Sequence, residues 1–392
     1  GFSTYYPIPA PVMKILGLSP SRIFSGFETS FFDALAAYDQ TIKHIEVELP
    51  IFKIYCTARS FYPGKKKWAL KRDLQYHTSI SAFKRKSAFA RKKIRQYRGD
   101  ADIIYQIGSL WDPIEEGISL PFFLQVDYTS LLSKKRNSEW KRKPGKEEEF
   151  WIRKETDLYN KAVRVLTTTE NARQSIINDY GIRPEKVVTV GAGVSAPYDK
   201  LQPDRFPDYA AKKILFVGKG FKGKGLDTLL SAFSKAKTAV PDAQLTIIGP
   251  TNLDIQGEGL NYLGRITDKD KVKEIYYQHS LFAMPSRFEP VGQVFLEAMS
   301  CKLPCIGTTA DAMPELIDHG RTGFTIEPGD SKTLAEYLVK ILKSPVPASE
   351  MGKAGFEKLR SNHVWPVVGK RIYEIFRSYA AQPATLINDT NL

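Results

Sequence analysis

Short apolar segments alternate with amphipathic segments along both halves of this chain, and this order restricts the fold more than any other feature. In the first half, strands are expected at residues 13–18, 44–47, 51–56, 101–106 and 122–126, and a helix at 29–37. In the second half, strands are expected at 214–218 and 244–250, and a helix at 226–233. Strands that alternate with helices form a parallel sheet covered by helices. The sequence therefore predicts an α/β protein.

The length and composition predict two domains. A chain of 392 residues is too long for one ordinary core, and its hydrophobic fraction of 42% is sufficient to fill two. Prolines interrupt the periodicity between residues 196 and 209, where we expect the boundary. The expected divisions are a tag or disordered extension over 1–12, an N-terminal domain over 13–205, a C-terminal domain over 206–365 and a frayed tail over 383–392.

No segment approaches the roughly 18–20 consecutive apolar residues of a membrane span, and no secretory signal pattern is present. The chain has three cysteines, which cannot close a disulfide framework, so we expect buried thiols in a reducing compartment. Its five histidines are scattered without metal-ligand spacing, and no metal site is predicted. These features favour a cytoplasmic protein.

A proline-glycine segment in the second half predicts an anion site at the start of a helix. Pro290 has the fixed φ and missing N–H that suit a first helical position, and Glu289 before it is biased towards extended backbone. We expect the helix to begin at Pro290. The free amides of Val291, Gly292 and Gln293 would then attract a phosphate, because Gly292 has no side chain to keep it away.

A second glutamate, Glu297, follows Glu289 by eight residues, which places the two carboxylates roughly 10–12 Å apart along a helix. Carboxylates repel phosphates and accept hydrogen bonds from hydroxyls. The pair therefore suits a ligand with hydroxyl groups at both ends and a diphosphate between them. The alternative is an amphipathic helix with two solvated glutamates.

Upstream, a buried strand ends at Gly218-Lys219, and a second glycine turn holds Lys224 before the next helix. Such a strand, basic glycine loop and helix can hold phosphates, although lysines on glycine turns are often only solvated. A further strand is expected to end at Tyr262-Leu-Gly-Arg265.

Together these motifs resemble the family-4 retaining glycosyltransferases. The resemblance rests on the Glu-x7-Glu spacing followed by Ala298-Met299 and Leu303-Pro304, and it runs nearly continuously from about 213 to 328, including the Pro-Glu-Leu-Ile element within 310–324. It implies the GT-B fold, in which two Rossmann-like domains face each other across a cleft. It also implies that the last helix, here 366–382, returns to the first domain.

The resemblance implies a role for each motif residue. Lys219 and Lys224 would bind the donor diphosphate, while Gly218 and Arg265 lie on the loops around the nucleotide. Glu289 would bind hydroxyls of the donor sugar and Glu297 the ribose. Two departures are Lys302, where the family usually has glycine, and Gly191-Ala-Gly-Val194, where an asparagine commonly precedes the glycine.

Three loops after strands of the first half are candidates for the acceptor side, since ligands bind beyond the carboxyl ends of parallel strands. They contain Gly26, Gly108-Ser109 and Asp127. In the family a histidine or polar residue often follows the strand at 122–126, so Asp127 is a candidate catalytic and acceptor-side residue. A turn or helix-capping aspartate is the equally weighted alternative.

Positive charge is concentrated in the first half. Residues 1–200 hold 33 Lys+Arg against 22 Asp+Glu, while 201–392 hold 24 against 21. The clusters Lys65–Lys67 and Lys84–Arg98 are candidate contacts with an anionic membrane, because Ile80, Phe83, Ala90 and Ile94 recur at helical spacing in the second cluster. A solvated helix that covers the sheet is the alternative, and no nucleic-acid partner is expected.

We therefore expect a retaining, metal-independent hexosyltransferase without a cofactor. Its donor would be a UDP-, GDP- or ADP-linked sugar and its acceptor a hydroxyl group, on a lipid or glycan at the inner face of a membrane in one version of the hypothesis. The alternatives are a sugar-nucleotide epimerase of the same fold and a non-catalytic sugar-nucleotide-binding protein.

Overall fold

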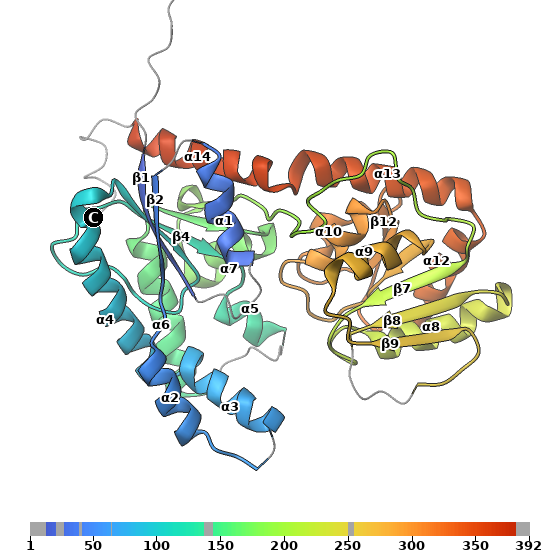
Figure 1. Ribbon diagram of the computed structural model, residues 1–392, viewed down its shortest axis with the longest axis horizontal. Coiled ribbons are helices and arrows are strands. Elements are labelled where there is room, and N and C mark those ends of the chain that lie inside the picture. The colour runs from blue at the N-terminus through green and yellow to red at the C-terminus, as the bar shows by residue number, and fades with distance from the viewer. Residues whose placement is uncertain are drawn as a thin grey trace, which may run out of the picture.

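A computed structural model describes residues 13–20, 27–38, 41–63, 65–136, 144–249 and 255–381. The expectations for residues 1–12, Gly26 and 383–392 lie outside these ranges. The described chain forms two α/β units that lie side by side, with a run of helices along one side of both (Figure 1).

The first sheet has six parallel strands in the order β2-β1-β3-β4-β5-β6. Its strands are β1 (Lys14–Ser19), β2 (Thr41–Glu46), β3 (Ile103–Ile107), β4 (Phe122–Val126), β5 (Arg164–Thr167) and β6 (Val187–Thr189). Every residue of β3 and β4 is buried. A parallel strand with both faces covered needs apolar side chains on both faces, and this explains the nearly unbroken apolar sequence of these two strands.

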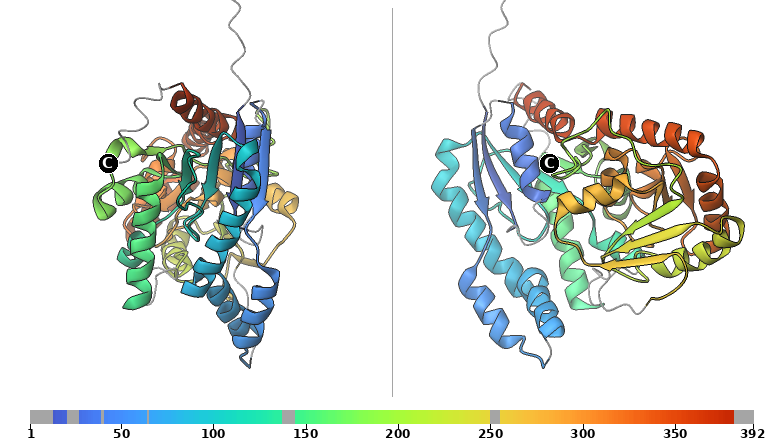
Figure 2. Two further views of the ribbon diagram at one scale, coloured as in Figure 1. Left: turned by 90° about the vertical axis from the view of Figure 1, so that its left-hand side faces the viewer. Right: turned by 45° about the vertical axis from the view of Figure 1, so that its right-hand side comes forward.

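The helices of the first domain lie around this sheet, some of them extending beyond one end of it (Figure 2). They are α1 (Phe27–Ala36), α2 (Pro50–Arg59), α3 (Lys65–Thr78), α4 (Ile80–Tyr97), α5 (Ser130–Lys135), α6 (Lys146–Lys161) and α7 (Glu170–Tyr180), with 3₁₀ turns at Arg98–Asp100 and Pro184–Lys186.

The expected strand at residues 51–56 is wrong, because this segment forms most of α2. Short apolar runs do not by themselves distinguish a strand from a helix. Pro50 stands in the first turn of α2, where a proline costs no hydrogen bond. Phe52 and Cys56, one helical turn apart, are the two buried residues of the helix.

The second sheet also has six parallel strands, in the order β12-β11-β10-β7-β8-β9. Its strands are β7 (Lys213–Val217), β8 (Gln244–Ile248), β9 (Leu260–Gly264), β10 (Leu281–Ala283), β11 (Cys305–Thr308) and β12 (Gly323–Ile326). Its helices are α8 (Leu226–Ala239), α9 (Lys269–Tyr277), α10 (Gln293–Ser300), α11 (Met313–Leu316) and α12 (Ser331–Leu342).

The chain ends with α13 (Pro345–Asn362) on the second domain and α14 (Trp365–Ala380) on the first. Val368, Ile372 and Phe376 of α14 lie in one buried cluster with Phe31 of α1 and Phe123 of β4. The last helix therefore completes the core of the first domain, as expected for the GT-B fold.

The three cysteines are free and buried, which confirms the expected buried thiols. Among the helices that the structure describes, none combines the length and apolar character needed to cross a bilayer.

The expected apolar stripe of α4 does not face outwards. Phe83, Ala90 and Ile94 are at most 4% exposed, and Ala90 and Ile94 belong to the core of the first domain. In this respect α4 is a helix that covers the sheet. Of its cations, Lys86 is buried, and Arg91 and Arg95 pair with Asp112 and Glu115.

Candidate active site

The basic glycine loop after β7 lies directly against the segment after β10. Gly225 has a φ of +72°, and a Cβ at this position would lie 1.9 Å from the carbonyl oxygen of Pro285. Only glycine therefore permits this approach. The turn before α8 and the segment that leads to Glu289 form one surface for this reason.

Arg287 fixes these two loops to each other. Its guanidinium makes two hydrogen bonds with Asp227 in the first turn of α8, at 2.8 and 3.0 Å, and its amide donates to the Gly223 carbonyl at 2.9 Å. Burial alone would raise the pKa of Asp227, but the hydrogen bonds from Arg287 hold this pKa below its ordinary value. The loop that carries Lys224 is thus held rigidly.

Lys224 and Glu289 meet at the centre of this surface. Lys224 Nζ lies 2.7 Å from Glu289 Oε2 and donates to the Phe288 carbonyl at 3.1 Å. The other carboxylate oxygen, Glu289 Oε1, accepts a hydrogen bond from the Gly292 amide at 3.1 Å. An ammonium and a helix-terminal amide therefore converge on one carboxylate.

The expectation that the helix begins at Pro290 is wrong. Helix α10 begins at Gln293, after Gly292 has taken a left-handed φ of +78°. The turn from Glu289 to Gly292 is closed by the glutamate side chain rather than by helical backbone. A Cβ at Gly292 would lie 2.4 Å from Leu316 Cδ1, so glycine is required for its conformation and for space.

Glu297 lies further along α10 and is partly buried. Its Oε2 accepts a hydrogen bond from the Tyr276 hydroxyl of α9 at 3.2 Å. Burial raises the pKa of Glu297 to about 7. Tyr276 has no motif of its own, and only the folded structure identifies it as a partner.

Lys219 and Arg265 are exposed and make no ion pair within the described part of the chain. They follow β7 and β9, which are separated by β8 in the sheet. The three strand ends lie close together, since the Gly249 amide donates to Gly264 and a Cβ at Gly249 would lie 2.5 Å from the Gly218 carbonyl oxygen.

Gln293 and Val291 direct their side chains to the first domain. Gln293 Oε1 accepts hydrogen bonds from the amide and hydroxyl of Ser195, and its Nε2 donates to the Gly193 carbonyl at 3.0 Å. Val291 packs against the cluster that includes α14. Only the main chain of these two residues is therefore available to contact a ligand in the site.

The segment Gly191–Val194 has a glycine at position 193 for a steric reason, while nothing in the structure explains the absence of an asparagine before it. A Cβ at Gly193 would lie 2.6 Å from the ring of Trp365, the first residue of α14. Arg371 of α14 donates to the Val190 carbonyl at 3.2 Å. Glycine at 193 therefore allows the interdomain segment to lie against the last helix.

On the acceptor side, Asp127 follows β4 and is partly buried. The next residue, Tyr128, contacts the second domain. Its hydroxyl donates to Asp311 Oδ1 at 3.1 Å, and its ring packs edge-on against Phe288 with centroids 5.1 Å apart. The end of β4 and the Glu289 loop are thereby brought together.

Asp311 is a site residue that the sequence reading did not identify. Its side chain is fully buried and its φ is +50°. Oδ1 accepts from Tyr128 and from Arg136 Nε at 3.0 Å, while Oδ2 accepts from the Glu289 amide at 3.1 Å. One carboxylate thus joins two residues of the first domain to the backbone of Glu289.

Glu315 makes a second contact of this kind. Its two oxygens accept from the amides of Glu170 and Asn171, at 2.7 and 2.8 Å, at the start of α7 in the first domain. Burial raises the pKa of Glu315. The Pro-Glu-Leu-Ile element was part of the resemblance, but its contact with α7 follows only from the fold.

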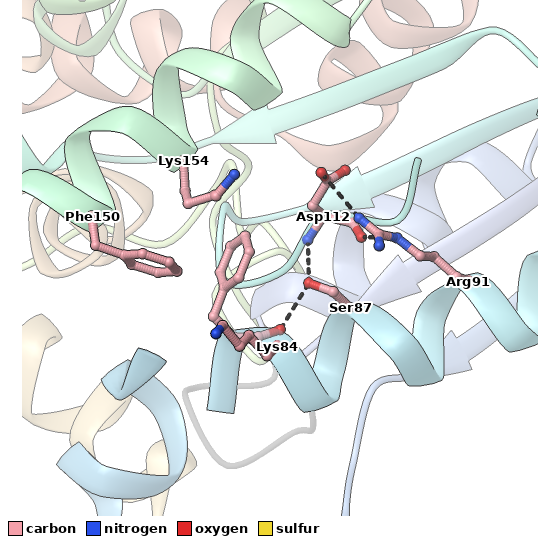
Figure 3. A pocket seen from close by; sticks show the side chains of 7 residues that line it. Lys84, Ser87, Arg91, Asp112, Phe150 and Lys154 are labelled. Atoms are coloured by element: carbon pink, nitrogen blue, oxygen red, sulfur yellow. Dashed lines mark hydrogen bonds and ion pairs between the residues drawn. The ribbon is translucent and has the colours of Figure 1, made fainter. Parts of the chain in front are cut away.

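A hollow of about 280 Å³ lies elsewhere, between α4, α6 and the loop after β3 (Figure 3). Asp112 in this hollow pairs with Arg91 at 3.2 Å and with Lys161 at 2.5 Å, and its amide donates to Ser87. The carboxylate and amide of Asp112 thus have their partners within the first domain. The hollow contains none of the motif residues and is not the candidate active site.

Residues 211–344 match the protein family described as Glycosyl transferases group 1. The chain is 31% identical over 170 residues to the GDP-mannose-dependent monoacylated alpha-(1-6)-phosphatidylinositol monomannoside mannosyltransferase of Corynebacterium glutamicum. This alignment covers 40% of the chain and 44% of that relative, so it spans less than half of either protein.

Two solved structures resemble the whole described fold. Sucrose-phosphate synthase from Thermosynechococcus elongatus has a TM-score of 0.69 at 17% identity, with 94% of this chain and 100% of that chain covered. Anabaena HepE in complex with UDP has a TM-score of 0.65 at 18% identity, with 93% and 100% covered. At these identities the likeness shows the fold alone.

The fold is GT-B, as the sequence predicted, and the second domain carries the group 1 glycosyltransferase motifs. The second domain is thus similar to group 1 glycosyltransferases, and the whole described chain has the GT-B fold.

Proposed function

We propose that this protein is a retaining hexosyltransferase that moves a sugar from a nucleoside diphosphate to a hydroxyl acceptor. Glu289 binds hydroxyls of the donor sugar, and Glu297 binds the ribose. Lys219, Lys224 and the amides that follow Pro290 stabilise the leaving diphosphate. UDP-, GDP- and ADP-linked sugars remain candidate donors.

The observation that carries this proposal is the convergence of Lys224 and the Gly292 amide on the Glu289 carboxylate, at 2.7 and 3.1 Å. The two groups already hold one anion, and an ammonium beside a helix N-terminus is an arrangement that favours phosphate. A diphosphate can replace the carboxylate because it offers more charge and more acceptor oxygens.

Donor binding would then change the partner of Glu289. When a phosphate takes Lys224 and the Gly292 amide, the carboxylate turns to accept hydrogen bonds from the sugar hydroxyls. The two residues thus act in sequence, and neither has to be repositioned by a large movement of the backbone. Hydrogen-bond donors and cations placed where negative charge grows in the transition state provide the largest part of such catalysis.

The ribose end of the donor is assigned to Glu297 on α10. An ionised Glu297 accepts hydrogen bonds from hydroxyls more strongly than a protonated one. Its pKa of about 7 makes this contact sensitive to pH near neutrality.

For the chemical step, the departing phosphate takes the proton of the acceptor hydroxyl on the face from which it leaves, so the anomeric configuration is retained. Asp127 lies on the acceptor side and orients that hydroxyl. Because lysines and amides meet the diphosphate charge, we expect turnover to be unchanged when EDTA removes divalent metal ions.

The test begins with a thermal-shift screen against sugar nucleotides, since a ligand at 100 times its Kd should stabilise the protein by about 2.7 kcal/mol. The donor found is then incubated with candidate acceptors, and NMR of the first product reports its anomeric configuration. An inverted product contradicts retention. An epimer formed from the labelled donor alone indicates an epimerase, and binding without transfer or hydrolysis indicates a non-catalytic protein.

We also propose an acceptor at an anionic membrane surface, on the inner face of the membrane. The corynebacterial relative is named for a phosphatidylinositol monomannoside acceptor, and that name supports a lipid-linked acceptor here. The clusters Lys65–Lys67 and Lys84–Arg98 supply the charge for such a surface.

A further inference from the structure

The outer face of α2 is apolar and open to solvent. Ile51 is 85% exposed, Ile54 70% and Tyr55 48%, and Phe61 just beyond the helix is 71% exposed. These four are half of the eight large apolar side chains that are exposed in the described chain, and they fall within eleven residues. Proteins rarely expose such a group of apolar residues without a partner.

This exposure does not result from a loosely attached helix. The opposite face of α2 holds Phe52 and Cys56 in a buried cluster with Tyr76 of α3. The Tyr76 hydroxyl accepts from the Leu49 amide at 2.8 Å, and Trp68 of α3 donates to the Thr57 carbonyl at 2.8 Å. Both ends of α2 are therefore fixed, and its outer face is a rigid surface.

Positive charge surrounds this surface. Residues 49–99, which include α2, α3 and α4, contain fifteen lysines and arginines and one aspartate. Their net charge of +14 equals that of the whole chain. Arg59, Lys67 and Lys71 are exposed beside the apolar face and make no ion pair within the described residues.

The topology places this surface on the acceptor side of the fold. β1, β2, β3 and β4 are parallel, so their carboxyl ends lie at one edge of the sheet. Helix α2 begins four residues after β2 ends, at the same edge from which Asp127 follows β4. In Figures 1 and 2, α2 and α3 extend beyond the sheet at this end of the first domain.

We infer that the outer face of α2 inserts into the headgroup and upper acyl region of an anionic membrane, with the cations of α2 and α3 on the lipid phosphates. An amphipathic helix with an apolar face and a basic rim binds membranes in this way. This inference deepens the membrane part of the proposed function. It changes the earlier expectation, because the inserted residues lie on α2 and not on α4.

Charge distinguishes a membrane from a second copy of the chain as the occupant. A symmetric dimer through α2 would bring two units of +14 against each other, and like charges oppose this contact. An anionic bilayer is complementary both to the apolar face and to its basic rim. The proposal therefore commits to the membrane.

The first experiment measures co-sedimentation of the full chain with vesicles, without donor or acceptor. Vesicles of phosphatidylcholine mixed with phosphatidylglycerol should retain the protein, and pure phosphatidylcholine should not. The double variant Ile51→Ser/Ile54→Ser should bind at least tenfold more weakly, since about 1 kcal/mol or more is lost for each side chain removed from the bilayer. The matched control is Val346→Ser, which removes a side chain that is also 70% exposed, on α13.

The basic rim is tested with Lys67→Gln/Lys71→Gln, for which about a fivefold loss for each cation is expected, together with a weaker dependence on salt. The control is Lys332→Gln/Lys343→Gln, a pair of exposed lysines at α12. If this control lowers affinity as much, only the total charge matters and the proposed rim is overturned.

A spectroscopic measurement does not depend on the affinity of the double variant. The native cysteines at 56, 301 and 305 are buried, so Ile54→Cys and Val346→Cys can each carry a polarity-sensitive dye selectively. A blue shift with anionic vesicles is expected only at position 54. An unshifted dye at 54, or vesicle binding unchanged by Ile51→Ser/Ile54→Ser, overturns the proposal.

Sedimentation velocity without vesicles tests the other occupant. A dimer that the double variant abolishes would assign the face to a second copy and overturn the membrane inference. Turnover of donor with a soluble acceptor is measured separately without vesicles. Its loss would count against the proposed transfer, and failure of vesicle binding alone would leave that transfer intact.

Discussion

The two sides of the candidate cleft are held in place by different means. In the second domain, the loops at Gly225 and Glu289 are fixed by contacts within that domain, through the close approach to Pro285 and the pairing of Arg287 with Asp227. The facing part of the first domain has supports of its own, as where Glu155 accepts from the amide and hydroxyl of Ser130, but it is also held from across the boundary. This difference implies that the geometry of the second-domain loops does not depend on the boundary, whereas that of the facing part of the first domain partly does.

The contacts across the boundary come from carboxylates of the second domain. Asp311 accepts from Tyr128 and Arg136, and Glu315 accepts from the first amides of α7. Helix α7 has its own cap, since the Thr169 side chain accepts from the Ala172 amide. Glu315 therefore fixes the position of α7 relative to the donor domain rather than merely satisfying its amides.

The largest expected effect concerns Lys224 and Glu289 in the loops of the second domain. Lys224→Ala should lower turnover about 100- to 1,000-fold, the typical cost of removing a donor that stabilises a leaving anion, and should also weaken nucleoside diphosphate binding. Glu289→Gln should lower turnover similarly but leave diphosphate affinity equal or higher, because no carboxylate then competes for Lys224. Turnover assays and calorimetry measure both. Equal losses of diphosphate affinity in the two variants would contradict the exchange of partners.

The next effect tests the boundary. Asp311→Asn removes the negative charge that Arg136 faces. The interaction between the two domains should weaken by about 2 kcal/mol, within the range for hydrogen bonds to charged groups. Turnover should fall about thirtyfold while the affinity for nucleoside diphosphate changes little, because the donor loops have their own supports. A loss of nucleotide affinity as large as the loss of turnover would contradict this expectation, since nucleotide binding would then depend on the boundary too.

A pH effect within the donor site is smaller. Nucleotide affinity should rise about tenfold from pH 6 to pH 8, as Glu297 ionises with its pKa of about 7 and accepts the ribose hydroxyls. Without ligand, the stability of the fold should change with pH in the opposite direction. The raised pKa stabilises the fold fully below the ordinary value of 4.5 and loses that contribution as pH rises through 7. Glu297→Gln should flatten both profiles, measured by calorimetry and by denaturant unfolding.

The smallest effect concerns α7. Glu315→Gln keeps an acceptor but removes a negative charge from a helix N-terminus, which should cost about 0.3–1 kcal/mol. The free energy of unfolding measures this loss. Because burial raises the pKa of Glu315, its ionisation lowers the stability of the parent protein as pH rises, so the advantage of the parent over the variant should grow as the solution is acidified. A difference that is constant with pH would mean that the charge of Glu315 is not involved.

The sequence predicted the second domain better than the first. The strands at 214–218 and 244–250 and the helix at 226–233 correspond to β7, β8 and α8, and the glycine positions identified the loops that meet. In the first domain, the apolar run at 51–56 was read as a strand although it forms α2. Because of that error the exposed apolar face of α2 was not predicted, since this face exists only when the segment is a helix.

Lys302 illustrates a departure that only the structure explains. It stands in the turn after α10 with a φ of +57°, where the family usually has glycine. Its Nζ donates to the carbonyls of Gln202, Pro203 and Arg205, at 2.8, 2.8 and 2.6 Å. These three hydrogen bonds offset a left-handed strain of about 1–2 kcal/mol.

Local patterns in the sequence predicted the α/β class, the two sheets and a candidate donor motif, because strand periodicity, glycine turns and the Glu-x7-Glu spacing act over a few residues. Tertiary structure alone decided that Lys224 pairs with Glu289, that Asp311 joins the two domains and that α2 leaves an apolar face uncovered. Each of these depends on which surfaces the packed sheets bring together, and residues more than sixty positions apart carry no local signal of such a meeting.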